Sequence, residues 1–473
     1  MQIRNPRTGK IDYILKVDAA EEILSKSDHL RAHQKNWLDS GIEHRISTLL
    51  QFHTQLSNHL NDLSGALSID TGRRQITQLE IQGALGVIQG RCFSVKQYYD
   101  HAEARPSVTN PTVKIVQQRI PYQLVGVISP WNFPLLLALI DTIPALLAGS
   151  AVLLKPSEVT PRFIDVLERC ISLTPGLSNV LSVIRGSAEA GKSVVSTSDV
   201  VCFTGSVETG KKIAAQCAER FIPAFLELGG KDPAIVLPDA NLDIATDAII
   251  RSCAGATGQA CQSLERVYVH RDIYDDFLDL LKDKVSLLSD NSNYDKGGVI
   301  GPLIFKKQAD KIQAQLEDAV KKGATIISGG NIKNINGGLW LLPTIVVDID
   351  HTMSIMSEET FGPVIPLMKF DTIEEAVRLA NDSQFGLSAS VFSSDIKMAR
   401  HVASQIEAGG ISINDASLTN QVFDAEKNSF KSSGLYGSRM GADGFLRFFR
   451  KKALLIQEGR ASDIYVQAEK LSQ

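Results

Sequence analysis

The spacing of hydrophobic residues changes along the chain and divides it into regions of different structure. Between Ala19 and Tyr99 apolar residues recur at the helix period, which predicts a series of helices. Residues 113–127 are rich in apolar and β-branched residues and are interrupted by Pro121, a pattern typical of strands or of a hairpin. We therefore expect a helical N-terminal region followed by a short β segment.

Beyond residue 127, short apolar runs alternate with helical stretches, first up to about Leu228 and again after Lys231. Such alternation is typical of parallel sheets covered by helices, so an α/β fold with two sheets is predicted. The strand candidates are residues 151–154, 180–184, 200–203 and 224–226 in the first series, and 234–237, 266–270, 326–328 and 344–347 in the second, which also contains a helix candidate at 273–288. We interpret the first series as a nucleotide-binding domain and the second as a separate α/β domain.

Length and composition are those of a large globular protein. With 473 residues the chain is too long for one hydrophobic core, and its 44% hydrophobic and 22% charged residues are ordinary values. The formal net charge of −4 gives no reason to expect nucleic acid or an anionic membrane as a partner. The N-terminus lacks an apolar signal core, and no apolar run is long enough to span a bilayer. A cytoplasmic protein of two or three domains is expected.

The six cysteines form no CxxC pair and show no ligand spacing with histidine. This pattern predicts neither a metal site nor a disulfide framework, and reduced thiols are expected.

The segment from Phe225 to Val269 contains both an acid and a thiol with chemical potential. It begins with FLELGGKDPAIVLPDANLD, in which Glu227 stands in an apolar setting before a Gly-Gly turn, and it ends with GATGQACQSLERVYV around Cys261. A cysteine is nucleophilic as its thiolate, and a carboxylate in apolar surroundings is suited to act as a general base. The pair predicts thioester chemistry. The alternative, which fits most single Glu or Cys residues, is a surface acid and a packed core cysteine.

Six short motifs stand in a definite order along the chain: PWNFP, KPSEVTP, FTGSVETGKK, LELGGKDP, GQAC and EETFGPV. Together they resemble the aldehyde dehydrogenase superfamily, and the similarity extends from NPRTGK near the start to GSRMG at residues 437–441. The resemblance implies a Rossmann-like parallel-sheet cofactor domain, a second α/β catalytic domain and a small β oligomerisation hairpin. The expected bounds are 1–105 and 125–229 for the NAD-binding domain, 230–435 for the catalytic domain, and 106–124 with 454–473 for the oligomerisation elements. A homodimer or homotetramer is expected, in which the tail from Leu454 onward could pair with another subunit.

The same resemblance assigns catalytic roles. It implies that Cys261 attacks the carbon of a small-molecule aldehyde and that the Asn132 side-chain amide and the Cys261 backbone N–H form an oxyanion hole. Glu227 would activate the water that hydrolyses the resulting thioester to a carboxylic acid. The presence of Glu227 argues for hydrolysis over transfer to coenzyme A.

A cofactor site is implied in the same way, with NAD as the expected cofactor and NADP as a possible one. Lys155 and Glu158 would contact the adenosine ribose, and Glu359 with Phe361 would hold and pack the nicotinamide ribose. The helix that Gly205 and Ser206 introduce would bind the pyrophosphate at its N-terminus. The full set of expected cofactor-binding residues is Lys155, Glu158, Gly205, Ser206, Leu228, Glu359, Phe361 and Trp131, and no metal ligand is expected.

Alternatives remain open. The sequence GSAEAGKS at residues 186–193 matches the GxxxxGK[ST] pattern of a P-loop nucleotide hydrolase, with Asp239 as the candidate Walker B acid. An NADP-using or succinic-semialdehyde-type dehydrogenase and a catalytically dead, crystallin-like relative are the others. The chain departs from the family pattern at positions that bear on proton relay. Ala256 stands where many members have Asn, and Asp141 stands where many have Lys. In addition, AEKNSF replaces PFGG, and residues 445–455 lack a glutamate that some relatives have.

The expected aldehyde tunnel is mostly apolar. By resemblance its wall consists of Phe133, Leu136, Leu137, Ile140, Ala260 and Gln262. None of these is a cation, and Asp141 would repel a distal carboxylate, which is costly to bury unpaired. Medium-chain aliphatic or aromatic aldehydes are therefore predicted to be better substrates than succinic semialdehyde, although Lys427 or Lys431 could supply a cation from the loop 417–431.

Overall fold

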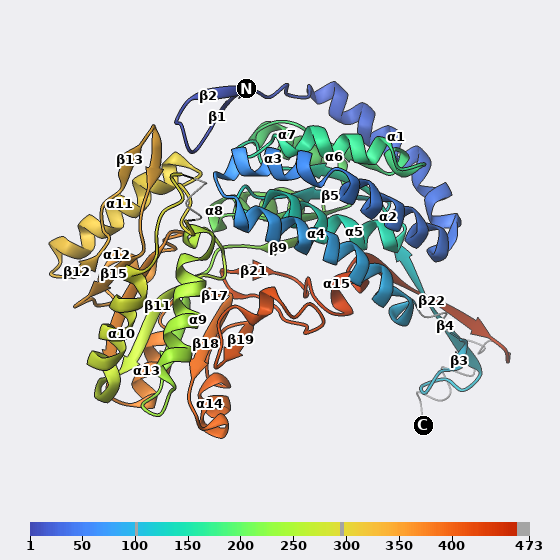
Figure 1. The fold of residues 1–473 in the computed structure, drawn as a ribbon. Coiled ribbons are helices and arrows are strands. Elements are labelled where there is room, and N and C mark those ends of the chain that lie inside the picture. The colour runs from blue at the N-terminus through green and yellow to red at the C-terminus, as the bar shows by residue number, and fades with distance from the viewer. Residues whose placement is uncertain (100–102, 294–297, 461–473) are drawn as a thin grey trace, which may run out of the picture.

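Two sheets of mostly parallel strands, each packed with helices, account for most of the chain (Figure 1). The computed structural model describes residues 1–99, 103–293 and 298–460. In Figure 1 the first sheet and its helices form the upper right lobe, and the second sheet with its helices forms the lower left lobe. This mixed α/β architecture confirms the predicted fold class.

Four consecutive helices make up most of the N-terminal region, as the helix-period pattern predicts. They are α1 (Ala20–Asp39), α2 (Gly41–Asn58), α3 (Leu60–Thr71) and α4 (Gln75–Ser94), and a short hairpin of β1 (Gln2–Arg4) and β2 (Ile11–Ile14) precedes them. Their buried residues, such as Leu30, Leu49 and Phe52, belong to the same hydrophobic core as the first sheet. The N-terminal helices are thus an integral layer of the first lobe.

The first sheet has the strand order β21-β9-β8-β5-β6-β7, and all its pairings are parallel except that of β21 with β9. Its strands are β5 (Leu124–Ile128), β6 (Ala151–Lys155), β7 (Leu181–Val183), β8 (Val200–Thr204), β9 (Ala224–Glu227) and β21 (Gly434–Leu435), and its helices include α5 (Pro134–Ala148), α6 (Phe163–Ser172), α7 (Ala188–Thr197) and α8 (Val207–Glu219). Every residue of β6 is buried. The four strand candidates of the first series are confirmed.

The second sheet has the order β12-β15-β16-β11-β10-β18-β19, with only β12 antiparallel to its neighbour. Its strands are β10 (Asp232–Val236), β11 (Leu264–His270), β12 (Thr325–Ser328), β15 (Thr344–Val347), β16 (Val364–Phe370), β18 (Ser388–Phe392) and β19 (Gly410–Ile413). Alternate residues of β10 enter different cores, since Ile235 belongs to one cluster and Val236 to another. This alternation places helices on both faces of the sheet.

Helices from the second half of the chain supply those two cores. They are α9 (Leu242–Ala254), α10 (Tyr274–Ser286), α11 (Lys306–Lys321), α12 (Ser354–Ser357), α13 (Ile373–Asn381) and α14 (Ile396–Ala403). The four strand candidates of the second series and the helix expected at 273–288 are confirmed. The strands β16, β18 and β19 had no counterpart among the candidates, and neither did the small hairpins β13 (Lys333–Ile335) with β14 (Gly338–Trp340) and β17 (Phe385–Gly386) with β20 (Phe430–Lys431).

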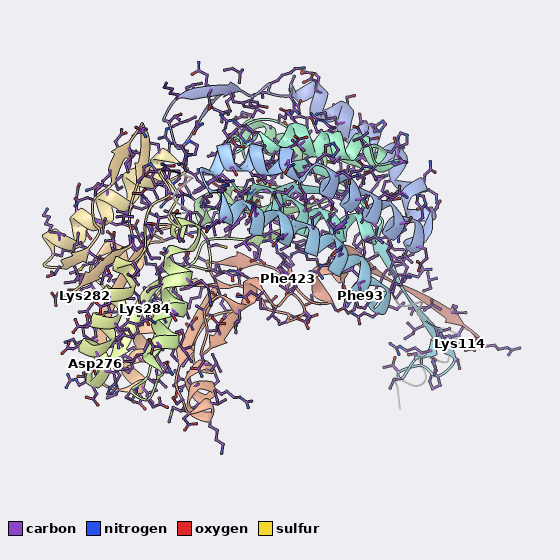
Figure 2. All side chains as sticks on the ribbon, viewed as in Figure 1. Phe93, Lys114, Asp276, Lys282, Lys284 and Phe423 are labelled. Atoms are coloured by element: carbon purple, nitrogen blue, oxygen red, sulfur yellow. The ribbon has the colours of Figure 1, made fainter. Side chains whose placement is uncertain are left out.

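A third sheet projects from the first lobe and carries Lys114 (Figures 1 and 2). It consists of β3 (Arg105–Pro106), β4 (Val113–Pro121) and β22 (Phe449–Gln457), in the order β22-β4-β3. The strand expected from Leu454 onward therefore begins earlier, at Phe449, and it pairs along its length with β4 of the same chain. Residues 461–473 of the expected oligomerisation tail lie outside the described residues.

The chain returns to the first lobe after the second sheet is complete. Gly434 of β21 pairs with Glu227 of β9, and Phe445 of α15 (Asp443–Leu446) and Phe448 are buried in the core of the first lobe. The region expected as the catalytic domain, 230–435, thus contains β21 at its end, a strand of the first sheet. This return places the segment before β21 over the carboxyl end of β9.

Among the described residues, no helix combines the length and the apolar character that crossing a membrane requires.

Candidate active site

Cys261 lies on a loop between α9 and β11 whose backbone is unusual. Ala256 and Thr257 have positive φ angles of 52° and 60°, and Gly258 follows with 65°. Left-handed backbone is costly for residues with a side chain, and such strain is typical of functional loops. At Gly258 a side chain would also overlap the backbone of Gly362, so the loop packs directly against the segment that follows Phe361.

Glu227 is the last residue of β9 and projects from the carboxyl end of the first sheet. Its Oε2 accepts a hydrogen bond of 3.1 Å from the hydroxyl of Ser429. Glu227, Cys261 and Asn132 line the same two adjoining cavities. The structure therefore brings the three predicted catalytic residues together from separate parts of the chain.

The surroundings of Cys261 favour the neutral thiol over the thiolate. Burial raises its pKa to about 12, and the carboxylates of Glu359, Asp232 and Glu227 act in the same direction, whereas Lys427 lowers it. Formation of the nucleophile consequently requires a proton acceptor in the cavity, and Glu227 lines that cavity.

Asn132 is buried at the start of the segment that leads into α5. Its Nδ2 donates a hydrogen bond of 3.0 Å to the carbonyl of Gln259 on the Cys261 loop, which leaves one N–H of the amide for another acceptor. Arg73 holds both segments: it donates to the carbonyl of Asn132 at 2.9 Å and to that of Ala256 at 2.7 Å. This buried guanidinium fixes the amide relative to the nucleophile loop.

A long cavity at the carboxyl ends of the first sheet contains Lys155, Glu158, Gly205, Ser206 and Trp131. Lys155 is only 4% exposed, and its ammonium donates a hydrogen bond to the carboxylate of Glu158 at 3.1 Å. It is a buried partner for a half-buried acid.

The backbone around Gly205 allows close approach to the beginning of α8. A Cβ at Gly205 would overlap the ring of Phe203. Ser206 caps α8 by accepting the N–H of Thr209 at 3.3 Å. The first-turn N–H groups of α8 lie at a helix N-terminus, the kind of position that binds phosphates in proteins.

A second cavity joins this one to Cys261 and is lined by Leu228, Glu359 and Phe361. The rings of Trp131 and Phe361 meet edge to face, with centroids 5.3 Å apart. Burial raises the pKa of Glu359 to about 8, with a further contribution from Glu265, and its carboxylate accepts the N–H of Gly230 at 3.2 Å.

Glu265 holds the segment that carries Glu359 and Phe361. Its carboxylate accepts the backbone N–H groups of Thr360 and Phe361, each at 2.7 Å, and pairs with the buried ammonium of Lys231 at 2.8 Å. Phe361 has a positive φ of 53°, a conformation that these bonds stabilise. Glu265 therefore positions the wall of the cavity without lining it.

The long cavity that contains Lys155 and the second cavity that joins it to Cys261 together fit a dinucleotide. They run from the Lys155 and Glu158 pair past a helix N-terminus to the aromatic residues Trp131 and Phe361 and then to Cys261. Polar groups for riboses, N–H groups for phosphates and a flat aromatic wall thus occur in the order that such a molecule needs. All expected cofactor-binding residues line one cavity or the other.

A third cavity on the far side of Cys261 contains the predicted apolar wall. It is lined by Phe133, Leu136, Leu137, Ile140, Ala260 and Gln262 together with Asn420, Phe423, Lys427, Arg439 and Met440. Phe423, labelled in Figure 2, lies on the C-terminal segment at the junction of the lobes. The predicted wall is thus present, and the loop supplies Lys427, one of the two cations that the sequence offered. The C-terminal segment also adds residues that the sequence did not place there, among them the cation Arg439.

The expected repulsion from Asp141 was wrong. Asp141 does not line the cavity but is buried, where it accepts a hydrogen bond from Arg439 at 2.8 Å and another from Arg447. Burial alone would raise the pKa of Asp141, but the two guanidinium groups hold this pKa below its ordinary value. Its charge is consequently neutralised inside the protein.

The P-loop hypothesis does not fit the structure. Helix α7 begins at Ala188, directly after Gly186, and the Lys192 ammonium pairs with the exposed Glu189 on the same helix. The candidate acid Asp239 lies after β10 in the other lobe, where its carboxylate accepts the Ser393 hydroxyl at 2.8 and 2.9 Å and the Asp395 N–H at 2.9 Å. The lysine and the acid therefore do not form a common phosphate site.

Known proteins resemble this chain over most of its length. The model of the aldehyde dehydrogenase family matches residues 1–454. A succinate-semialdehyde dehydrogenase [NADP(+)] of Mycolicibacterium smegmatis is 33% identical over 446 residues, which cover 93% of this chain and 86% of the relative. The solved structure of PutA from Anabaena variabilis, assigned to the aldehyde dehydrogenases, is 46% identical with a TM-score of 0.96, and covers 98% of this chain and 99% of its own. Betaine aldehyde dehydrogenase from Staphylococcus aureus, solved in complex with NAD+, is 28% identical with a TM-score of 0.92. The match covers 98% of this chain and 92% of the betaine aldehyde dehydrogenase chain.

The fold and the arrangement of thiol, acid and dinucleotide-shaped cavity are those of an NAD(P)-dependent dehydrogenase. The chain belongs to the aldehyde dehydrogenase family.

Proposed function

We propose that this protein oxidises an aldehyde to a carboxylic acid through a thioester on Cys261. The observation that carries the proposal is the position of Cys261 and Glu227, which line the point where a dinucleotide-shaped cavity meets an apolar cavity closed by the C-terminal segment. An aldehyde in the apolar cavity would have its carbonyl carbon between the thiol and the nicotinamide end of the cofactor cavity.

The residues divide the reaction into two halves. In the first, the Cys261 sulfur bonds to the aldehyde carbon while the thiol proton passes to Glu227, and the N–H groups of Asn132 and of the Cys261 backbone bind the oxyanion. NAD(P) supplies the acceptor for the hydride that leaves this carbon as the carbonyl re-forms. Glu227 then releases the thiol proton to solvent. In the second half, Glu227 takes a proton from water, whose oxygen bonds to the thioester carbon as the carbon–sulfur bond breaks, and it returns this proton to the Cys261 sulfur. The products are a carboxylic acid, reduced cofactor and a proton.

NAD is proposed as the preferred cofactor. The support is Glu158, because a carboxylate beside the adenosine ribose accepts hydrogen bonds from hydroxyl groups and repels a 2′-phosphate. Lys155 shares the charge of this acid at 3.1 Å and weakens the repulsion. Use of NADP at lower efficiency is consistent with this arrangement and with the cofactor in the name of the Mycolicibacterium smegmatis relative.

A homodimer or homotetramer in the cytoplasm is proposed as the working form. The projecting strand β22 exposes Leu455 and Ile456 to 68% and 44%, and apolar side chains on a projecting edge favour burial against a second subunit. The described cysteines are all free thiols, which is typical of proteins from a reducing compartment.

A turnover screen tests the proposed function. The purified protein is mixed with a panel of aldehydes and either NAD or NADP, and reduced cofactor is followed by absorbance. Reduction that depends on aldehyde, with a carboxylic acid as product, is expected. Absence of reduction with every aldehyde would indicate a catalytically dead relative, and release of phosphate from ATP would indicate a nucleotide hydrolase.

A further inference from the structure

We propose that Lys427 forms a subsite for a carboxylate at the far end of the aldehyde, so that the substrate is a semialdehyde with an apolar middle. This inference rests on the proposed function and specifies its substrate class. It replaces the expectation that uncharged aldehydes are preferred, which depended on a tunnel wall without cations and on repulsion from Asp141, an acid that does not line the cavity.

Lys427 is placed to meet the end of a substrate. It lines the same cavity as Cys261, and its backbone N–H is bound to the hydroxyl of Ser438 at 3.0 Å. Its aliphatic stem passes over Gly410, where a Cβ would come within 2.9 Å of the lysine Cδ. The absence of a side chain at Gly410 thus leaves the room that the stem occupies.

The ammonium of Lys427 has no hydrogen bond or ion pair with the residues that the structure describes, although the side chain is half-buried. The contrast with Lys431 in the same segment is informative. The Lys431 ammonium pairs with Glu407 at 2.7 Å and donates to two carbonyl groups, those of Asn381 and Ser383. A half-buried cation without such a partner favours an anionic ligand in the cavity that it lines.

The charge beneath the cavity has the same sign. Arg439 lines the cavity and shares the single carboxylate of Asp141 with Arg447, so two guanidinium groups face one acid. The Nε atoms of both arginines are buried without a hydrogen-bond partner among the described residues. Glu227 lines the same cavity and raises the pKa of Arg439, but the positive charges of Lys427, Arg439 and Arg447 outnumber the two acids Glu227 and Asp141 and favour an anion there.

The wall between the thiol and Lys427 suits a short methylene chain. Phe133, Leu137 and Met440 are apolar and line the same cavity as Cys261 and Lys427. An aldehyde carbon at Cys261, methylene groups along this wall and a carboxylate at the ammonium would use each part of the cavity. A charge-assisted hydrogen bond between ammonium and carboxylate then fixes the orientation of the substrate.

A different role for Lys427 gives a different outcome and can be separated by experiment. Its charge lowers the pKa of the Cys261 thiol, so it could assist the nucleophile directly. In that case its removal would slow the reaction with every aldehyde. A subsite for a distal carboxylate affects only substrates that carry one.

The test compares succinic semialdehyde with its methyl ester, which has the same aldehyde and chain but no charge, and uses hexanal as a reference. Wild type, Lys427→Met and the control Lys431→Met are assayed for kcat/KM with NAD. Wild type and the control are expected to favour the acid over its ester by at least about tenfold. Lys427→Met should lose this preference through a rise in KM for the acid, with the ester and hexanal unchanged within about twofold.

Equal losses on all three substrates in Lys427→Met would overturn the subsite and assign Lys427 to the thiol. A wild type that oxidises hexanal and the ester at least as efficiently as the acid would overturn the subsite while leaving the proposed function intact. Failure of wild type to reduce cofactor with any of the three would overturn both.

Discussion

The Ser429 hydroxyl donates a hydrogen bond of 3.1 Å to Oε2 of Glu227. The two residues are far apart in the sequence, but the pairing of β21 with β9 at Gly434 and Glu227 brings their segments together. The Leu228 N–H also donates a hydrogen bond to the carbonyl of Ser433 at 2.8 Å. These contacts hold the segment of Ser429 over the acid. One carboxylate oxygen is thereby fixed, and the other is available to a water in the cavity.

Replacement of Ser429 should therefore affect hydrolysis of the thioester more than its formation. Ser429→Ala is expected to retain a burst of about one reduced cofactor per active site while the steady-state rate falls about tenfold, because a hydrogen bond to a charged group is lost. Stopped-flow measurement of burst and steady state gives both numbers. Ser429→Thr should restore the steady-state rate.

Ser432→Ala is the matched control, since Ser432 lies three residues further along the same segment and its hydroxyl makes no hydrogen bond with the described residues. It should behave as wild type. An unchanged steady-state rate in Ser429→Ala would show that Glu227 does not depend on this bond.

The cofactor preference should depend on Glu158. Wild type is expected to use NAD with a kcat/KM at least about tenfold above that for NADP, equivalent to about 1.4 kcal/mol. Glu158→Gln removes the negative charge and keeps hydrogen-bonding groups, so the ratio should fall toward one, mainly through improved use of NADP. Comparable efficiencies of the two cofactors in wild type would contradict the role given to Glu158.

The stability of the cofactor-free protein should depend on pH through Glu359. Its pKa is raised from 4.5 to about 8 in the folded state, so the stability that the protonated carboxyl contributes is present below about pH 4.5 and is lost as the pH rises to about 8. Glu359→Gln cannot ionise. From about pH 5 to about pH 8.5 its Tm should rise relative to that of wild type, by roughly 1 °C for each 1 kcal/mol in a chain of 473 residues.

Other buried acids titrate in both proteins and cancel in this difference. The Tm values are measured by calorimetry at each pH without cofactor. A difference that stays constant over the whole range would mean that Glu359 is ionised in the folded protein throughout.

Much of the fold follows from the sequence because buried parallel strands are continuous apolar runs. Residues 151–154 and 200–203 show this clearly, and each is a strand buried at every position. Strand β18 was missed because SASVF contains small polar residues, and its burial depends on neighbouring strands. The start of strand β22 was predicted at Leu454, too far along the chain, because the preceding sequence RKKA is charged. The whole strand nevertheless pairs with β4.

The predicted site residues are brought together in the structure because each stands in a motif with its own local signal. Ser429, Arg73 and Glu265 had no such signal. Their importance arises from contacts with residues far away in sequence, such as the bonds from Arg73 to Asn132 and Ala256. Asp141 was misjudged for the same reason, since its helix position was evident but its partners Arg439 and Arg447 were not.

The central claim is that Cys261 carries the acyl group and that Glu227 releases it. Intact-protein mass spectrometry of Glu227→Gln after mixing with NAD and hexanal tests this directly. The account predicts a mass increase of one acyl group per chain, located on Cys261, a burst of reduced cofactor that slows at neutral pH and recovers as pH rises, and no modification in Cys261→Ala. Sustained turnover by Glu227→Gln, or an acyl group on another residue, would contradict it.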